Sequence, residues 1–199
     1  MMKKIDIFHS NLWYFDIQIY FDLKENLLQE IYALKNKYET VSLTNRGGWQ
    51  SQSVYTIENY RSNNLKILMH KIVRTIEDGI LIPRHTISID SLWYNVNTPG
   101  SHNDTHNHPN CDLAGVFYMK VPEDRENCGT LVLENDHIFT EYKYQLSINP
   151  EHRSFYHGIE PIEGRFYMFP SHIKHRVLTN ETDEDRISFA CNMTIQSKI

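Results

Sequence analysis

Three histidines and an aspartate lie within seven positions of this chain, in the segment Ser101-His-Asn-Asp-Thr-His-Asn-His-Pro-Asn110. Side chains two positions apart on an extended segment point the same way, so His106 and His108 could give two neighbouring imidazole ligands to one metal ion. A third ligand must come from elsewhere, and His175 ends a second histidine-bearing segment, Phe169-Pro-Ser-His-Ile-Lys-His175. This pattern is typical of a mononuclear iron site.

The first segment also fits a polar surface loop, because Asn, Asp, Thr and Pro are turn residues. Further chemistry comes from Arg186-Ile-Ser188, since in a strand Arg186 and Ser188 would share one face. An arginine inside a barrel needs an anion, and its planar fork matches a carboxylate, with the serine hydroxyl as a second donor. The alternative, which spacing alone favours, is a rim arginine paired with Asp183, Glu184 or Asp185.

Composition limits the classes of protein that this chain can belong to. With 199 residues, 40% hydrophobic and 23% charged, it is typical of a soluble globular protein, and we expect one domain over 1–199. The net charge of −5 and the scattered Lys and Arg residues imply no nucleic-acid partner. The N-terminal sequence lacks the apolar core of a signal peptide and no run approaches membrane-spanning length, so we expect a cytoplasmic protein without a membrane partner.

Apolar residues at helical spacing predict two amphipathic helices, at 22–38 and 64–78. Asp22 is placed to cap the first helix, and Asn63 or Asn64 the second.

From about residue 85, short runs of β-branched and aromatic residues predict strands instead, at 86–96, 113–121, 130–133, 165–169 and 187–194. The intervals are too short for crossover helices, so the sheets should be mostly antiparallel, as a sandwich or barrel. We therefore expect an α+β, mainly β fold with a helical N-terminal part over about 1–84. The β core should span about 85–196, with the helices packed on the outer face of one sheet.

Taken together, these motifs resemble the iron(II)- and 2-oxoglutarate-dependent oxygenases, and among them a group of small bacterial and phage proteins. The resemblance spans about residues 40–195, and it implies the fold of that superfamily, a double-stranded β-helix or jelly roll. The residues that carry it are Gly47-Gly-Trp-Gln-Ser51, Trp93-Tyr-Asn95, His106-Asn-His-Pro-Asn110, Gly115-Val-Phe-Tyr118, Phe169-Pro-Ser171 with His175, and Arg186-Ile-Ser188 with Asn192.

The resemblance implies that His106 and His175 bind iron(II). It also implies that Arg186, with Ser188 nearby, pairs with the distal carboxylate of 2-oxoglutarate, the cosubstrate. Strand alternation adds Asn95 and Tyr118 as residues that complete the cosubstrate pocket, although Tyr118 also fits a core aromatic with a satisfied hydroxyl.

The second metal ligand departs from the pattern of the superfamily, which has His-x-Asp or His-x-Glu where this chain has His106-Asn-His108. Either His108 is the ligand, or His102-Asn-Asp104 supplies the motif and Asp104 is. We favour His106, His108 and His175, because in the small-protein group the His-x-His-Pro pair leads directly into the Gly-Val-Phe-Tyr strand. Asp104 would then accept a hydrogen bond that fixes an imidazole tautomer.

The function implied is an oxygenase, a hydroxylase in outcome, that decarboxylates 2-oxoglutarate to succinate while oxidising a substrate that the sequence does not identify. Two alternatives are a cupin-type three-histidine metal enzyme that does not use 2-oxoglutarate and a non-enzymatic metal-binding β-sandwich module. The determinants of the substrate should lie on loops such as 44–53, 97–105 and 134–160. The sequence does not indicate the oligomeric state.

Overall fold

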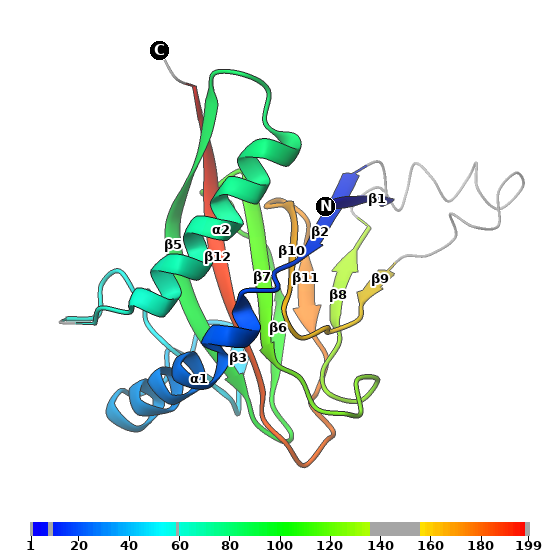
Figure 1. Ribbon diagram of the computed structural model, residues 1–199. Helices are drawn as coiled ribbons and strands as arrows, with labels where there is room; N and C mark the ends of the chain where they lie inside the picture. Colours follow the sequence, from blue (N-terminus) through cyan, green and yellow to red (C-terminus); the bar gives the residue numbers. More distant parts are fainter. Residues whose placement is uncertain (1, 8–9, 59, 136–155, 198–199) are drawn as a thin grey trace, which may run out of the picture.

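Two antiparallel sheets make up most of the protein. The computed structural model describes residues 2–7, 10–58, 60–135 and 156–197 (Figure 1). The large sheet has the strand order β1-β2-β10-β7-β12-β5-β4, and the small sheet has the order β3-β6-β11-β8-β9. All of these neighbours pair antiparallel. The mainly β, antiparallel character predicted from the sequence is confirmed.

The bounds of the strands are as follows. The large sheet consists of β1 (Lys3–Ile7), β2 (Ser10–Asp16), β10 (Arg165–Pro170), β7 (Leu113–Lys120), β12 (Arg186–Ser197), β5 (His85–Asn97) and β4 (Trp49–Gln50). The small sheet consists of β3 (Asn45–Arg46), β6 (His102–His106), β11 (His175–Val177), β8 (Leu131–Glu134) and β9 (Tyr156–Ile159).

Both predicted helices are present, as α1 (Tyr20–Lys37) and α2 (Asn63–Ile80). The predicted caps were wrong. Asp22 lies inside the first turn of α1, which has no side-chain cap. The N-cap of α2 is Ser62, which comes before both of the asparagines that were predicted to cap this helix. The Ser62 backbone is extended, and its hydroxyl accepts a hydrogen bond from the Leu65 N–H at 2.9 Å. Neither helix is long and apolar enough to cross a membrane, among the residues that the structure describes.

The two helices cover the outer face of the large sheet, as predicted (Figure 1). Because side chains alternate along β7, the large sheet packs against the helices with one face and against the small sheet with the other. Phe117 faces the helices and packs edge-on against Tyr20 of α1, with 5.0 Å between ring centroids. Its neighbour Tyr118 belongs to a second apolar cluster, which includes Leu131 and Leu133 of the small sheet. The large sheet therefore has helices on one side and the small sheet on the other.

The stretch before residue 85 is not only helical, because it also contains β1 to β4. Residue spacing did not predict these strands, nor β6, β9 and β11. Strand β2 gains its place by pairing with β10, where Phe15 lies opposite Phe166. A partner so far along the chain leaves no sign in local residue spacing.

Replacing Phe117 should test the packing of helices on the large sheet. Phe117 is fully buried, so Phe117→Ala should lower the free energy of unfolding by about 3–5 kcal/mol. Chemical denaturation measures this change. Ile82→Ala is the control, because Ile82 is 68% exposed and its loss should cost no more than about 0.5 kcal/mol. Similar small costs for both variants would contradict the packing described.

Candidate active site

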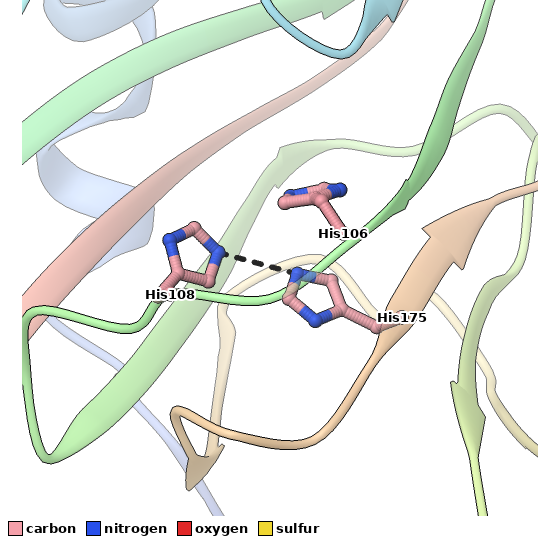
Figure 2. Close-up of side chains that lie close together, drawn as sticks. All are labelled: His106, His108 and His175. Carbon is pink, nitrogen blue, oxygen red and sulfur yellow. Dashed lines mark hydrogen bonds between the residues drawn. The ribbon is translucent and has the colours of Figure 1, made fainter.

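Three histidines meet between the two sheets. His106 at the end of β6 lies directly opposite His175 at the start of β11, and His108 follows two residues beyond the end of β6. Their ligand atoms all lie within 4.8 Å of one another, and Figure 2 shows the three rings converging. This group could hold a metal ion.

The hydrogen bonds of two of these rings fix their tautomers. The Nδ1 atom of His106 lies 2.7 Å from the Asp104 carbonyl oxygen, and that of His175 lies 2.9 Å from the Ile173 carbonyl oxygen. A carbonyl only accepts, so each Nδ1 carries the proton and each Nε2 keeps its lone pair for a metal.

The spacing of the ring nitrogens also suits a metal. Nε2 of His108 lies 3.3 Å from Nε2 of His175 (Figure 2). Two imidazole nitrogens about 2.1 Å from one metal lie about 3 Å apart when they occupy adjacent coordination positions. The pair therefore needs little movement to share an ion.

Burial keeps all three imidazoles neutral at pH 7. Burial is the larger cause and the neighbouring imidazoles act in the same direction, and together they lower the pKa of His108 to about 4 and that of His175 to about 3. Burial also lowers the pKa of His106, although the Asp104 carbonyl oxygen opposes that shift. Neutral imidazole is the form that binds a metal.

Asp104, the alternative second ligand, does not lie in this group. Its carboxylate pairs with the Arg46 guanidinium at 2.5 Å and lies 3.6 Å from Nε2 of His102. His106 donates its Nδ1–H to the backbone carbonyl oxygen of Asp104, whereas the Asp104 carboxylate pairs with Arg46.

A β-bulge explains why Asp104 and His106 do not share a face. His175 pairs with His106 but Val177 pairs with Asn103, so β6 carries one more residue than β11 across this interval. The extra residue shifts the alternation of β6. As a result, Asn103 and His106 both line the cavity between the sheets, and Asp104 does not.

Arg186 lies across the cavity on the large sheet and is 2% exposed. Its Nη1 donates to the Gly129 carbonyl oxygen and its Nη2 to Oδ1 of Asn97, both at 2.6 Å. Its Nε has no partner among the described residues. Both partners are neutral, so the guanidinium charge is buried without an anion. A buried charge of this kind is costly until an anion pairs with it.

The alternative of a rim arginine paired with an acidic neighbour does not hold, because Arg186 is buried and its partners are neutral. The Glu184 carboxylate pairs with Lys120 at 3.2 Å, and that of Asp185 accepts from the Tyr32 hydroxyl at 3.0 Å. Arg186 instead points inward. It lies in β12 two residues before Ser188, and both side chains are on the face of the strand that lines the cavity.

Asn95, Ser188 and Tyr118 form a row across β5, β12 and β7, since Ser188 pairs with both of the others. All three line the cavity beside Arg186. The Tyr118 hydroxyl is buried and has no partner among the described residues. Burial raises the pKa of Tyr118 to about 12, although the nearby Arg186 opposes the shift, so the hydroxyl keeps its proton and can donate it.

A cavity of about 430 Å³ joins the histidine group to Arg186 and this row. Asn97 and Gly129, which accept hydrogen bonds from Arg186, were not predicted as site residues. Trp93 was named in the resemblance but was given no role in the site, where its ring centroid lies 5.8 Å from that of His108. The alternation Ser91-x-Trp93-x-Asn95-x-Asn97 was the available signal for Asn97. No comparable pattern marks Gly129.

The loops predicted to choose the substrate are described only in part. The loops at 44–53 and 97–105 both contribute to the cavity lining. Most of the third loop, at 136–155, lies outside the described residues.

Comparison with known proteins identifies the class. Residues 91–192 match the family model described as "Putative 2OG-Fe(II) oxygenase". The chain belongs to this family of oxygenases, enzymes that use iron(II) and 2-oxoglutarate. A search of curated proteins found no match.

Solved structures of the same fold include several oxygenases. A prolyl-4-hydroxylase from Pseudomonas putida is 14% identical, with a TM-score of 0.61 over 97% of this chain and 91% of that one. HygX from Streptomyces hygroscopicus, solved with nickel and 2-oxoglutarate, is 11% identical, with a TM-score of 0.60 over 91% of this chain and 82% of that one. At such identity the likeness shows a shared fold.

The lowered histidine pKa values should make the metal-free protein less stable in mild acid. Unfolded histidine has a pKa of about 6.5, whereas His108 and His175 in the fold titrate at about 4 and about 3. Between these values only the unfolded chain binds the protons, so the free energy of unfolding falls as pH decreases from 6.5.

Urea denaturation of chelator-treated protein between pH 7.5 and 4.5 measures this loss. His108→Gln should show a shallower decline, because one of the depressed groups is gone. Equal declines in the two proteins would contradict the lowered pKa of His108.

Proposed function

We propose that His106, His108 and His175 hold the iron(II) ion and that Arg186 binds the distal carboxylate of 2-oxoglutarate. The observation that carries the proposal is the buried Arg186 guanidinium, which has only neutral partners and lines the same cavity as the histidines. A dicarboxylic 2-oxo acid is a ligand with an anionic group for each end of that cavity.

The unsatisfied atoms in the cavity support this ligand. Nε of Arg186 and the Tyr118 hydroxyl are both buried donors without a partner among the described residues, and a carboxylate can accept from both. Ser188 lies beside Tyr118 in the ladder and offers a third donor. Asn95, on the other side of Ser188, completes the pocket.

The tautomers of His106 and His175 and the neutral state of all three histidines leave ring nitrogens available to bind a metal ion at this end of the cavity. An iron(II) ion bound there supplies the oxidative decarboxylation of 2-oxoglutarate to succinate and carbon dioxide, and with it the oxidation of the substrate. Three neutral ligands leave the ion's full charge of two, one unit more than with a carboxylate ligand, which favours an anionic cosubstrate. Three protein ligands also leave room for the two oxygen atoms of a 2-oxo acid group.

We further propose hydroxylation as the outcome, with one oxygen atom of dioxygen entering succinate and the other entering the substrate. The proposed architecture is the double-stranded β-helix, in one domain over 1–199. The packing of α1, α2 and β2 on the same sheet as the β core supports a single domain. Neither alternative function holds, because the chain belongs to a family of 2-oxoglutarate-dependent enzymes.

The cosubstrate role of Arg186 can be tested by spectroscopy. Anaerobic protein mixed with iron(II) and 2-oxoglutarate should show the weak visible charge-transfer band of the chelated complex. Arg186→Ala should raise the apparent dissociation constant of 2-oxoglutarate by about 30-fold or more, since removing one partner of a buried charge pair costs at least about 2 kcal/mol.

Asn97→Asp is the matched variant. Asn97 already accepts from Arg186, so an aspartate there would supply an internal carboxylate that competes with 2-oxoglutarate. We expect weaker 2-oxoglutarate binding with unchanged iron binding. A band that is as strong in both variants as in the unaltered protein would rule out the role of Arg186.

A separate pair of variants tests whether His108 or Asp104 is the second iron ligand. His108→Ala should abolish iron binding, because the group loses one of its three nitrogens. Asp104→Ala should weaken it at most modestly, because the Asp104 carboxylate pairs with Arg46. Iron content after anaerobic loading and desalting measures both. The opposite result, loss of iron only with Asp104→Ala, would assign Asp104 as the ligand.

A further inference from the structure

The cavity extends beyond the residues proposed for 2-oxoglutarate. Arg186, Ser188, Ala190 and Asn192 alternate along the cavity face of β12. Asn192 lies six residues from Arg186, about 20 Å along the strand. Ala190 pairs with Trp93, which packs against His108. The histidines therefore lie toward the Asn192 end of the cavity. Since 2-oxoglutarate would occupy the Arg186 end, the space near Asn192 is left for the substrate.

Asn192 has an unsatisfied atom at this end. Its Oδ1 is buried and has no partner among the described residues. A bulge lies directly beside it, because Asn192 pairs with Ser91 while Met193 pairs with Ile89. A buried amide oxygen without a donor costs free energy, which a ligand N–H would recover.

A second set of amides lines the opposite side of Trp93. Gln50 in β4 lies opposite Asn95 of β5, and the following residues run on beside β5, where the Ser51 N–H donates to the Tyr94 carbonyl oxygen. Gln50 and Gln52 both line the cavity. No hydrogen bond joins either side-chain amide to another part of the described chain.

Charge is the feature that narrows the class of ligand. Arg186 is the one arginine, lysine, aspartate or glutamate among the described residues that line the cavity. Apart from the histidines, the polar lining near Trp93 consists of amides and hydroxyls. In the proposed function the two anionic ends of 2-oxoglutarate pair with Arg186 and the iron ion. A further ionic group near Trp93 would therefore lose its water without gaining a counter-ion, so the cavity selects against it.

We infer that Gln50, Gln52, Trp93 and Asn192 form a substrate subsite for an uncharged carboxamide or peptide group, which rests on the proposed function for the position of the iron. An amide offers a donor and an acceptor side by side, and so complements another amide with two hydrogen bonds. The indole face of Trp93 provides a flat surface for such a planar group. The group to be oxidised would lie next to this amide.

Three blocked amino acids of similar size test the inference: the N-acetyl methylamides of glutamine, glutamate and lysine. Their dissociation constants are measured by saturation-transfer NMR on the full chain loaded with zinc and 2-oxoglutarate, which cannot turn over. We expect the glutamine probe to bind at least tenfold more tightly than either charged probe. Uridine, a planar amide-like base, should bind more weakly than the glutamine probe.

Variants that add a negative charge then test whether Asn192 and Gln50 cause the preference for the uncharged probe. Asn192→Asp should reverse the preference, so that the lysine probe binds at least tenfold more tightly than to the unaltered protein. Gln50→Glu, the second variant, should act in the same direction if the first does not fold. Asn26→Asp on the exposed surface of α1 is the matched control and should leave all probe affinities unchanged.

Equal affinities for the three probes, tighter binding of uridine, or no binding of the glutamine probe would each overturn the inference. So would a preference that survives both charge variants. The charge-transfer band with iron(II) and 2-oxoglutarate is recorded first on the same protein. Its absence would count against the proposed function, whereas its presence without probe discrimination would count against the subsite alone.

Discussion

The burial of the Arg186 charge among neutral partners is the constraint on which the site depends. The ladder between β12 and β5 puts Asn97 directly opposite Arg186, and Gly129 supplies a carbonyl oxygen from the other side. Gly129 has a φ of +90°, and a Cβ there would lie 2.8 Å from the Leu178 carbonyl oxygen. A residue with a side chain would therefore strain the turn that brings this carbonyl to Arg186. The cradle holds the guanidinium in place without neutralising it, so its charge remains for an anion.

The positions of His106 and His175 depend on the pairing of two short strands in the small sheet, β6 and β11. His106 and His175 face each other across β6 and β11, and backbone carbonyls hold both rings by Nδ1. Register shifts occur beside His106 and His175, beside Ser188 and Tyr118, and beside Asn192. The shift in β6 lets Asn103 and His106, an odd number of residues apart, both face the cavity. The site is thus built at irregularities of otherwise regular sheets.

The helices cover the large sheet, and none of their residues lines the cavity. Their apolar faces cover the side of β5, β7 and β12 that points away from the small sheet. This leaves the inner side of the same strands free to carry polar residues. The fold therefore separates packing from chemistry by strand alternation, with Phe117 on one face of β7 and Tyr118 on the other. Such a division lets one strand stabilise the core and line the pocket at once.

The sequence by itself determined the residue types of the site, both helices, the main strands and the antiparallel character, because these follow from local spacing and side-chain chemistry. It also identified the oxygenase family from an ordered set of motifs. The tertiary structure decided what depends on long-range pairing: the place of β2, the cradle of Arg186, and the direction in which Asp104 points. The bulge in β6 shows the reason most clearly. One extra residue reverses which side chains face inward, and only the register against β11 reveals it.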